Sequence, residues 1–294
     1  MRQLQRATHK SKLIIAACAA ITLCACSGFG QAEVDKSFAV FLSDTHISEQ
    51  ARDEQDAATN AASRLSLCVQ KILAKKPHPS VALFCGDLTH NGRPEQMALF
   101  RKCIQPLSDA GIKCRLMPGN HDYYFESGVH YQELFAGELA TSVVSNKVAG
   151  VIEMETVDIV CLDTPDMITE DGWWGRIDGA QLDWLKAYMK KHEGQKPFFI
   201  CTHNHYQLLP VPAGLNMFTT AAGIISGHAH RYGLEKVGRG VPQVFIPSTF
   251  TDPYGYVEMR PKDGGFTFTL ITEDDKNERN GKSVTAEKKV EKAK

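Results

Sequence analysis

Five short polar segments carry the side chains of this sequence that are best suited to chemistry, and each follows an apolar run. They are Ser43-Asp44-Thr45-His46, Gly86-Asp87, Gly119-Asn120-His121-Asp122, Thr202-His203 and Gly227-His228-Ala229-His230. Together they offer carboxylate, amide and imidazole groups, a mixture that suits zinc, manganese or iron. One carboxylate can bridge two ions with its two oxygens. The set therefore predicts a site for a pair of metal ions.

Two features of the spacing suggest how the ligands would be shared. Asp87 follows a central apolar run, so it is the natural candidate for the bridging carboxylate. His228 and His230 would point to the same face of an extended segment, so each can serve a different ion. His205 is an alternative to His203. We favour His203 because it directly follows its strand.

The elements that position these segments alternate between short β-rich runs and helical patterns, which is typical of an α/β fold. We expect strands over 37–42, 81–85, 112–117, 156–162, 196–201 and 223–226, and helices over 56–73, 94–110 and 178–192. Runs over 241–246, 254–259 and 265–271 alternate like antiparallel strands. Ligands bind at the carboxyl ends of strands in open α/β sheets, and the polar segments lie at such ends.

The first 32 residues differ from the rest of the chain. A basic lead-in precedes an apolar run over 13–25, which falls short of the roughly 20 residues that cross a bilayer. This pattern is typical of an export signal. Leu23-Cys24-Ala25-Cys26 resembles a bacterial lipobox, and the alternative is ordinary cleavage after Ala32. We expect an exported protein of the cell envelope or periplasm, held at the membrane by a lipid anchor on Cys26.

The remaining chain predicts one large domain over 33–272. The stretch 123–154 is less regular and is interpreted as an inserted cap. Residues 273–294 are almost all charged or polar, which predicts a disordered tail. The formal net charge of −1 and the lack of a basic stripe argue against a nucleic-acid polymer as partner.

Six cysteines follow the export signal. Cys85, Cys161 and Cys201 lie inside apolar runs, where a thiol behaves as a small hydrophobic group. The one plausible disulfide joins Cys103 to Cys114.

The ordered set of polar segments resembles the motif series of the calcineurin-like metallophosphoesterases over roughly 37–259. The residues that carry the resemblance are Asp44-Thr45-His46, Gly86-Asp87, Gly119-Asn120-His121-Asp122, His203 and Gly227-His228-Ala229-His230. The stretch 175–185 also resembles a helix start that is common in this family. Its members share a four-layer α/β/β/α sandwich of two mixed β-sheets, so the resemblance implies that fold.

The resemblance also implies a role for each residue. Asp44, His46, Asp87 and His230 would hold one metal ion, and Asp87, Asn120, His203 and His228 would hold the other, both ions being Mn, Zn or Fe. His121 matches the catalytic histidine of the family, and Asp122 would orient it. A hydroxide that bridges the ions would attack phosphorus in line, and protonated His121 would donate to the leaving alkoxide.

The predicted function is that of an exported, dinuclear metal-dependent phosphoesterase that hydrolyses a small phosphomonoester or phosphodiester. His90 stands where purple acid phosphatases carry a tyrosine ligand, and His121 stands where lipid A precursor hydrolases carry arginine. The stretch from Gly86 to Gly92 resembles the bacterial cyclic-nucleotide phosphodiesterase branch instead. The alternative is a non-catalytic envelope lipoprotein that binds a metal or a partner with the same fold.

Overall fold

The computed structural model describes residues 33–48, 57–123, 131–165, 174–193, 195–209, 217–273 and 275–287. The export signal and lipid anchor predicted over 1–32 lie outside these residues. Within the described ranges, no helix is both long enough and apolar enough to span a bilayer.

The first sheet is built around three parallel strands with almost continuously apolar sequences. Its order is β12-β11-β10-β1-β2-β3. The strands are β1 (Val34–Leu42), β2 (His78–Cys85), β3 (Lys113–Met117), β10 (Gly255–Lys262), β11 (Gly265–Thr272) and β12 (Ser283–Glu287). Strands β1, β2 and β3 pair in parallel, and β10, β11 and β12 pair antiparallel with their neighbours. A strand covered on both faces needs apolar residues at every position, as in the fully buried run from Phe38 to Leu42.

The second sheet has the order β4-β5-β6-β7-β9-β8. Its strands are β4 (Gly150–Glu153), β5 (Asp158–Cys161), β6 (Phe198–Thr202), β7 (Gly223–Ser226), β8 (Gly233–Val237) and β9 (Val241–Phe245). Strands β5, β6, β7 and β9 run in parallel, while β4 and β8 are antiparallel edge strands. The expectation that 241–246 pairs like an antiparallel strand is therefore correct toward β8 and wrong toward β7.

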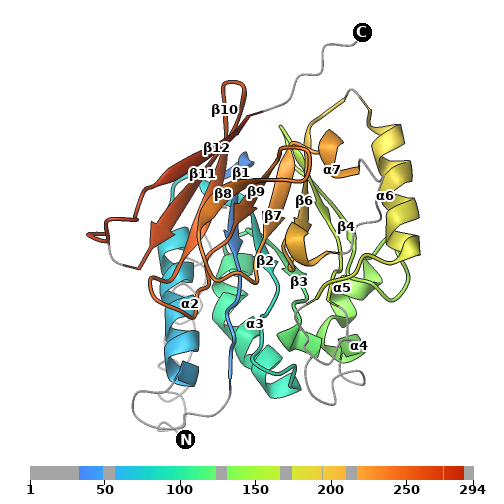
Figure 1. The fold of residues 1–294 in the computed structure, drawn as a ribbon. Coiled ribbons are helices and arrows are strands. Elements are labelled where there is room, and N and C mark those ends of the chain that lie inside the picture. Colours follow the sequence, from blue (N-terminus) through green and yellow to red (C-terminus); the bar gives the residue numbers. More distant parts are fainter. Residues whose placement is uncertain are drawn as a thin grey trace, which may run out of the picture. The chain divides into compact units, whose positions relative to one another are not determined.

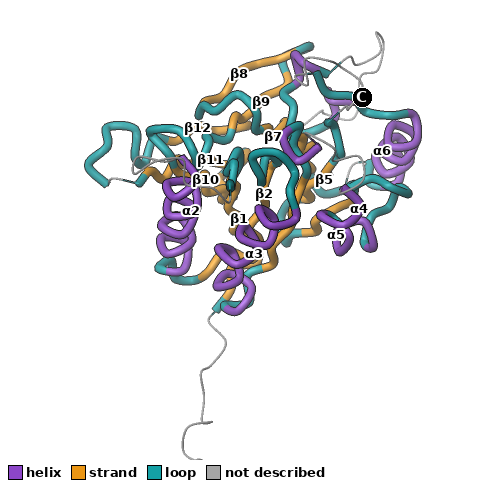
Figure 2. The backbone as a smooth tube through the Cα atoms, turned by 90° about the horizontal axis from the view of Figure 1, so that it is seen from below, coloured by secondary structure: helices purple, strands orange, loops and turns teal. Residues whose placement is uncertain are grey.

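Helices cover the outer faces of the two sheets. Helices α2 (Ala57–Leu73) and α3 (Pro94–Asp109) lie along the first sheet, and α6 (Gly179–Lys191) lies on the far side of the second (Figures 1 and 2). The ring of Phe100 on α3 packs on Phe84 of β2 with centroids 5.2 Å apart. Tyr188 on α6 packs on Phe198 of β6 at 5.7 Å, in a second cluster that also contains α7 (Met217–Thr220). Each sheet thus carries its own helical layer.

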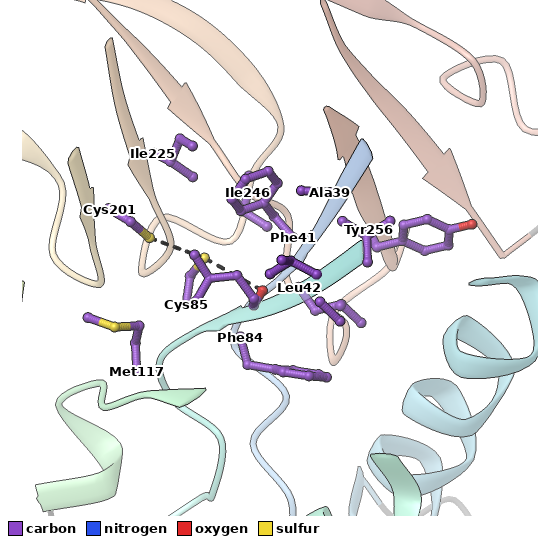
Figure 3. Close-up of a cluster of buried hydrophobic side chains, with 14 of the residues drawn as sticks. Ala39, Phe41, Leu42, Phe84, Cys85, Met117, Cys201, Ile225, Ile246 and Tyr256 are labelled. Atoms are coloured by element: carbon purple, nitrogen blue, oxygen red, sulfur yellow. Dashed lines mark hydrogen bonds between the residues drawn. The ribbon is translucent and has the colours of Figure 1, made fainter. Parts of the chain in front are cut away.

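The inner faces of the two sheets pack directly on each other. Phe199 of β6 meets Phe266 and Phe268 of β11 edge to face, with ring centroids 5.4 and 5.3 Å apart. The sulfur atoms of Cys85 on β2 and Cys201 on β6 lie 3.6 Å apart (Figure 3). The architecture is the four-layer α/β/β/α sandwich that the sequence predicted.

The C-terminal tail corrects one prediction. Residues 275–287 are ordered into turns and strand β12, which pairs with β11 in the register Phe268↔Val284 and Phe266↔Ala286. Edge pairing is made by backbone N–H and C=O groups, so a strand with few apolar side chains can still form. The side chain of Ala286 is buried. The disordered tail predicted from 273 is wrong for this part, and 288–294 lie outside the described residues.

The expected cap over 123–154 is also corrected where the structure describes it. Two short helices, α4 (Tyr131–Leu134) and α5 (Ala136–Ala140), lead to β4. Tyr131, Leu134 and Phe135 are buried in the main core. The stretch 131–154 therefore belongs to the sandwich, because its apolar side chains fill the core and β4 extends the second sheet.

All six described cysteines are free thiols, so the predicted Cys103–Cys114 disulfide is wrong. The two thiols face different partners. The Sγ of Cys114 receives a hydrogen bond from Ser108 at 3.6 Å, whereas the Sγ of Cys103 lies against the carbonyl of Ala62 at 4.0 Å. Cys85, Cys161 and Cys201 are fully buried, as expected for thiols in apolar strands.

Candidate metal centre

The polar segments at the strand ends come together across the two sheets. Strands β1, β2 and β3 of the first sheet lead to Asp44 and His46, to Asp87 and to Asn120. Strands β6 and β7 of the second sheet lead to His203 and to His228 and His230. The backbone N–H of His228 donates to Oδ2 of Asp44 at 3.0 Å, which joins the two sheets at this edge. All seven residues predicted as metal ligands lie at this one place.

The first cluster consists of Asp44, His46, Asp87 and His230. One donor atom from each residue lies within 4.8 Å of the others. The Nε2 atoms of His46 and His230 are 3.3 Å apart, and Nε2 of His230 is 3.1 Å from Oδ1 of Asp44. Asp44 and Asp87 are fully buried, while His230 is exposed. The buried members are thus fixed by the sheet, and the cluster opens toward solvent at His230.

The second cluster consists of Asp87, Asn120, His203 and His228. The Oδ1 atom of Asn120 lies 3.0 Å from Nε2 of His203 and 2.9 Å from Nδ1 of His228, and these two ring nitrogens are 3.2 Å apart. Nε2 of His203 is 3.3 Å from Oδ2 of Asp87. The structure places His203 in this cluster. His205 lies outside it, with its Nδ1 against Oε1 of Gln207 at 2.9 Å.

Asp87 is the residue that the two clusters share. Its Oδ2 faces both histidine sets, at 3.7 Å from Nε2 of His46 and 3.3 Å from Nε2 of His203. Its Oδ1 accepts the backbone N–H of His121 at 2.8 Å. The sequence suggested sharing through both oxygens, whereas the structure presents Oδ2 to both clusters because Oδ1 holds the turn that begins at His121.

Backbone strain is concentrated at this centre. Six described residues other than glycine have a left-handed φ between 45° and 65°, and five of them are predicted ligands. The five are Asp44, His46, Asp87, His228 and His230, and the sixth is Asn146 in an exposed loop. Such a conformation costs about 1–3 kcal/mol per residue, so it persists only where the surroundings enforce it. Strain at five converging polar residues indicates a functional site.

Two motif glycines are required by the close approach of the same segments. A Cβ atom on Gly119 would collide with the backbone nitrogen and Oδ1 of Asp87. A Cβ atom on Gly227 would collide with Oγ of Ser43 and would stand 3.0 Å from Oδ2 of Asp44. These positions therefore exclude any side chain, which explains why glycine precedes Asn120 and His228.

Burial and charge fix the protonation of the histidines in the metal-free protein. Burial lowers the pKa of His46 and of His228 to about 4, so both rings are neutral at neutral pH. Burial also acts to lower the pKa of His203, but the adjacent Asp87 carboxylate outweighs it and raises that pKa to about 9. The Asp87 pKa is lowered, because His203 outweighs the effect of burial. A bound metal ion would therefore replace the proton of His203, which lies among two carboxylates and four imidazoles.

The donor set fits a pair of metal ions on three observations. Two ligands at about 2.0–2.2 Å from one ion stand roughly 3.0–3.5 Å apart, which is the spacing of both ring-nitrogen pairs. Oδ1 of Asp44 is buried and accepts no hydrogen bond of proper geometry. Nδ1–H of His203 donates to the carbonyl of Cys85 at 2.8 Å, so a neutral ring points the Nε2 lone pair into the cluster.

His121 lies beside the first cluster. Its ring stands edge-on to that of His46 with centroids 4.5 Å apart, and Nδ1 lies 2.8 Å from the carbonyl oxygen of His90. The side chains of His46, His90 and His121 form a third group of ring nitrogens within 4.8 Å of one another. Sequence reasoning missed the role of the His90 carbonyl, because a backbone contact leaves no signal in side-chain types.

Asp122 links two loops of the site. Its buried carboxylate accepts the backbone N–H groups of Leu88, Thr89 and Gly119 at 3.1, 2.9 and 2.8 Å, and the hydroxyl of Thr89 at 2.7 Å. Burial and the nearby Asp87 raise its pKa to about 6. These four donors occupy the carboxylate, and the orientation of His121 by Asp122 stays a prediction. Asp122 ties the loop after Asp87 to the loop before Asn120.

Comparisons with known proteins agree with this geometry. A family model described as Calcineurin-like phosphoesterase matches residues 39–232. A probable cyclic nucleotide phosphodiesterase of Rhodococcus erythropolis is 31% identical over 154 residues, which cover 52% of this chain and 47% of the relative. The match thus spans about half the length of that relative. A probable glycerophosphodiester phosphodiesterase GpdQ of Arcobacter nitrofigilis is 24% identical over 206 residues, covering 65% of this chain and 71% of the relative.

Solved structures share the fold. A dimetal phosphatase from Danio rerio superposes with a TM-score of 0.62 at 13% identity, covering 85% of this chain and 98% of the other. A purple acid phosphatase from yellow lupin superposes with a TM-score of 0.58 at 13% identity, covering 85% and 52%. The chain belongs to the calcineurin-like phosphoesterases. Two curated relatives carry phosphodiesterase names, in agreement with the branch of the family that the sequence resembles.

Proposed function

We propose that this protein is a dinuclear phosphodiesterase that hydrolyses a small organic phosphodiester. The observation that carries the proposal is the sharing of Asp87 by two clusters of metal-binding side chains. Asp44, His46 and His230 would hold one ion with Asp87, and Asn120, His203 and His228 would hold the other. Carboxylate, amide and imidazole donors suit manganese, zinc or iron, so we propose ions of this group.

The bound ions would supply a water of lowered pKa and positive charge that neutralises the phosphate oxygens. The protein supplies the positions of the groups around them. Asp87 and His203 stand on different sheets and fix the two halves of the centre. The carbonyl of His90 accepts Nδ1–H of His121, so Nε2 of this ring is the atom that would exchange a proton with substrate. His121 would thus act as general acid toward the leaving oxygen.

The substrate class follows from the charge of the chain and from its relatives. A formal net charge of −1 provides no field for a polyanion, which favours a small substrate held by the metal centre. Two relatives carry names that specify a cyclic nucleotide and a glycerophosphodiester as substrates. Both substrates are small diesters with an alkyl leaving group, and we propose a substrate of this kind.

We also propose that the protein is exported and lipidated on Cys26, as the N-terminal pattern of the sequence suggests. Mass spectrometry of the mature chain tests this directly. A diacylglycerol on Cys26 is the expected result. A mature N-terminus at Glu33 without lipid would contradict lipidation while still supporting export.

The enzymatic proposal is tested with the purified chain after reloading with manganese, zinc or iron. Each form is assayed on a phosphomonoester, a linear glycerophosphodiester and a cyclic nucleotide, and the metal content is measured in parallel. We expect two ions per chain and the highest kcat/KM on a diester. No turnover with any metal would sink the proposal and leave the non-catalytic alternative. Preference for the monoester would overturn the assignment of the substrate class.

A further inference from the structure

Asp163 is a fully buried carboxylate just beyond the carboxyl end of β5. No described lysine or arginine forms an ion pair with it. Its oxygens instead accept the hydroxyl of Tyr123 at 3.1 Å, the hydroxyl of Tyr131, and the backbone N–H of Val148 at 2.9 Å. Three neutral donors therefore contact this buried carboxylate directly, and the positive charge of Lys147 acts on it without an ion-pair contact.

Hydrogen bonds hold the backbone and the surroundings of Asp163 in place. Gln181 in the first turn of α6 holds its backbone from both sides, accepting its N–H at 2.9 Å and donating to its carbonyl at 2.8 Å. The N–H of Gln181 is capped by the carboxylate of Asp178 at 2.8 Å. The rings of Tyr123 and Tyr131 stack with centroids 4.4 Å apart. The carboxylate of Asp163 is thus held in a defined position, where it accepts the hydroxyl groups of Tyr123 and Tyr131.

Asp163 is connected to the turn that carries His121. Residues His121–Tyr123 form a single turn of 3₁₀ helix. The first sheet holds this turn through the N–H of His121, which donates to Asp87, and through the contacts of Asp122 with the loop after β2. The bond from Tyr123 to Asp163 holds the same turn from the second sheet. That sheet also carries His203 and His228.

A comparison along β5 argues against a purely structural role. Asp158, at the other end of this strand, also accepts a tyrosine hydroxyl, that of Tyr188 at 2.8 Å, but it has Lys196 as a counter-ion at 2.5 Å. A buried carboxylate without an ion-pair contact is an expensive way to gain stability, because a charge that leaves water costs free energy unless it is paired. Its hydrogen bond to Tyr123 in the turn that carries His121 points to positioning.

We propose that Asp163, acting through the hydroxyl of Tyr123, is a positioning residue that sets His121 relative to the metal-binding residues of the second sheet. The inference rests on the proposed role of His121 as general acid. Acid catalysis matters most for a leaving group that departs poorly without a proton. The positioning role therefore predicts a defect that depends on the leaving group.

The test compares Tyr123→Phe and Asp163→Asn with the matched control Tyr188→Phe. Each is assayed on a diester that releases an alkyl alcohol and on one that releases p-nitrophenolate, which leaves without protonation. We expect Tyr123→Phe and Asp163→Asn to lose about 10- to 100-fold in kcat on the alkyl substrate. KM, metal content and kcat on the aryl substrate should stay within about twofold of wild type. Tyr188→Phe should leave the ratio of the two kcat values unchanged.

Equal losses on both substrates, or loss of metal, would overturn the inference, because a structural defect acts on both reactions alike. Tyr123→Phe removes one hydroxyl from a half-buried ring, so it remains informative if Asp163→Asn does not fold. His121→Ala is measured in parallel to separate the two proposals. If His121→Ala changes the ratio and Tyr123→Phe does not, only the positioning role fails. If neither changes it, the proposed role of His121 fails as well.

Discussion

Strand β5 has a buried aspartate near each end, and the two carboxylates have different surroundings. Asp158, at the amino end, is paired with Lys196 and bonded to Tyr188. Asp163, beyond the carboxyl end, is buried without an ion pair to any described residue and holds two tyrosine hydroxyls. The same contrast holds for the sandwich as a whole, because left-handed residues and shared buried carboxylates gather at the carboxyl ends of the strands.

The contrast between the two ends shows where this fold places groups whose burial is unfavourable. At the carboxyl ends, Asp44, Asp87 and Asp122 are all buried. Burial and the nearby Asp87 raise the pKa of Asp122. Burial also acts to raise the pKa of Asp44, but His230 and His203 outweigh it and lower that pKa. An ordinary stabilising surface would not place three carboxylates together. The arrangement makes sense when cations bind between them. Substitutions at this edge should therefore cost activity, whereas substitutions at the opposite ends should cost stability.

Asp87→Asn should have the largest effect on activity. It removes the charge that both clusters share, so we expect kcat/KM to fall roughly 10³-fold or more, with fewer ions bound. Steady-state kinetics and metal analysis of the same samples measure both effects. The substitution keeps the size and the acceptor Oδ1 for the N–H of His121. Retention of both ions with full activity would show that Asp87 is not the shared ligand.

His121→Ala should come next, with a loss of about 10²-fold in kcat on an alkyl diester. The ring stands beside the first cluster and lies outside the two predicted ligand sets, so the protein should keep two ions. Metal analysis and the thermal shift on adding metal check this point. If the variant loses an ion, the third group of imidazoles, with His46 and His90, takes part in metal binding and the assigned role is wrong.

Lys196→Met tests the structural end of β5. The ammonium group pairs with Asp158 and donates to the carbonyl of Met154 at 2.7 Å. Its side chain is about one third exposed, so solvent screening reduces the loss to about 1–2 kcal/mol in the free energy of unfolding. Denaturant unfolding measures the loss, and kcat/KM should match wild type. A drop in activity with unchanged stability would erase the contrast between the two ends.

The resemblance to the calcineurin-like family implied the four-layer sandwich, whereas periodic signals in the sequence predicted the α/β fold and the meeting of the ligands at the strand ends. Continuous apolar runs predicted the buried parallel strands, and polar residues after each run predicted which side chains would converge. Strand β12 escaped this reasoning, since an edge strand is held by backbone bonds to β11 and needs few apolar residues. The predicted disulfide between Cys103 and Cys114 failed for another reason. A sequence does not show which way a side chain points, and these two thiols contact different partners.

The directions of individual side chains in the site could be obtained only from the structure. Consecutive residues on a 3₁₀ turn point about 120° apart, so Asp122 contacts the loop after β2 although it adjoins His121 in sequence. His203 and His205 share one face of an extended segment in a linear reading. The chain leaves β6 at Thr202, and the short 3₁₀ helix η2 (Tyr206–Leu208) begins directly after His205. That bend sends the ring of His205 toward Gln207, away from the cluster.

The smallest effect concerns protons within the metal-free centre. His203 should stay protonated up to about pH 9, while His46 and His228 should stay neutral down to about pH 4. Because the His203 proton occupies the place of a cation, apparent metal affinity should rise with pH up to about 9, by at most about tenfold per unit for one proton. The ring ¹⁵N shifts of the metal-free protein report each protonation state, and metal titrations report the affinity. A neutral His203 at pH 7 would mean that the charge of Asp87 does not outweigh the effect of burial on the pKa of His203.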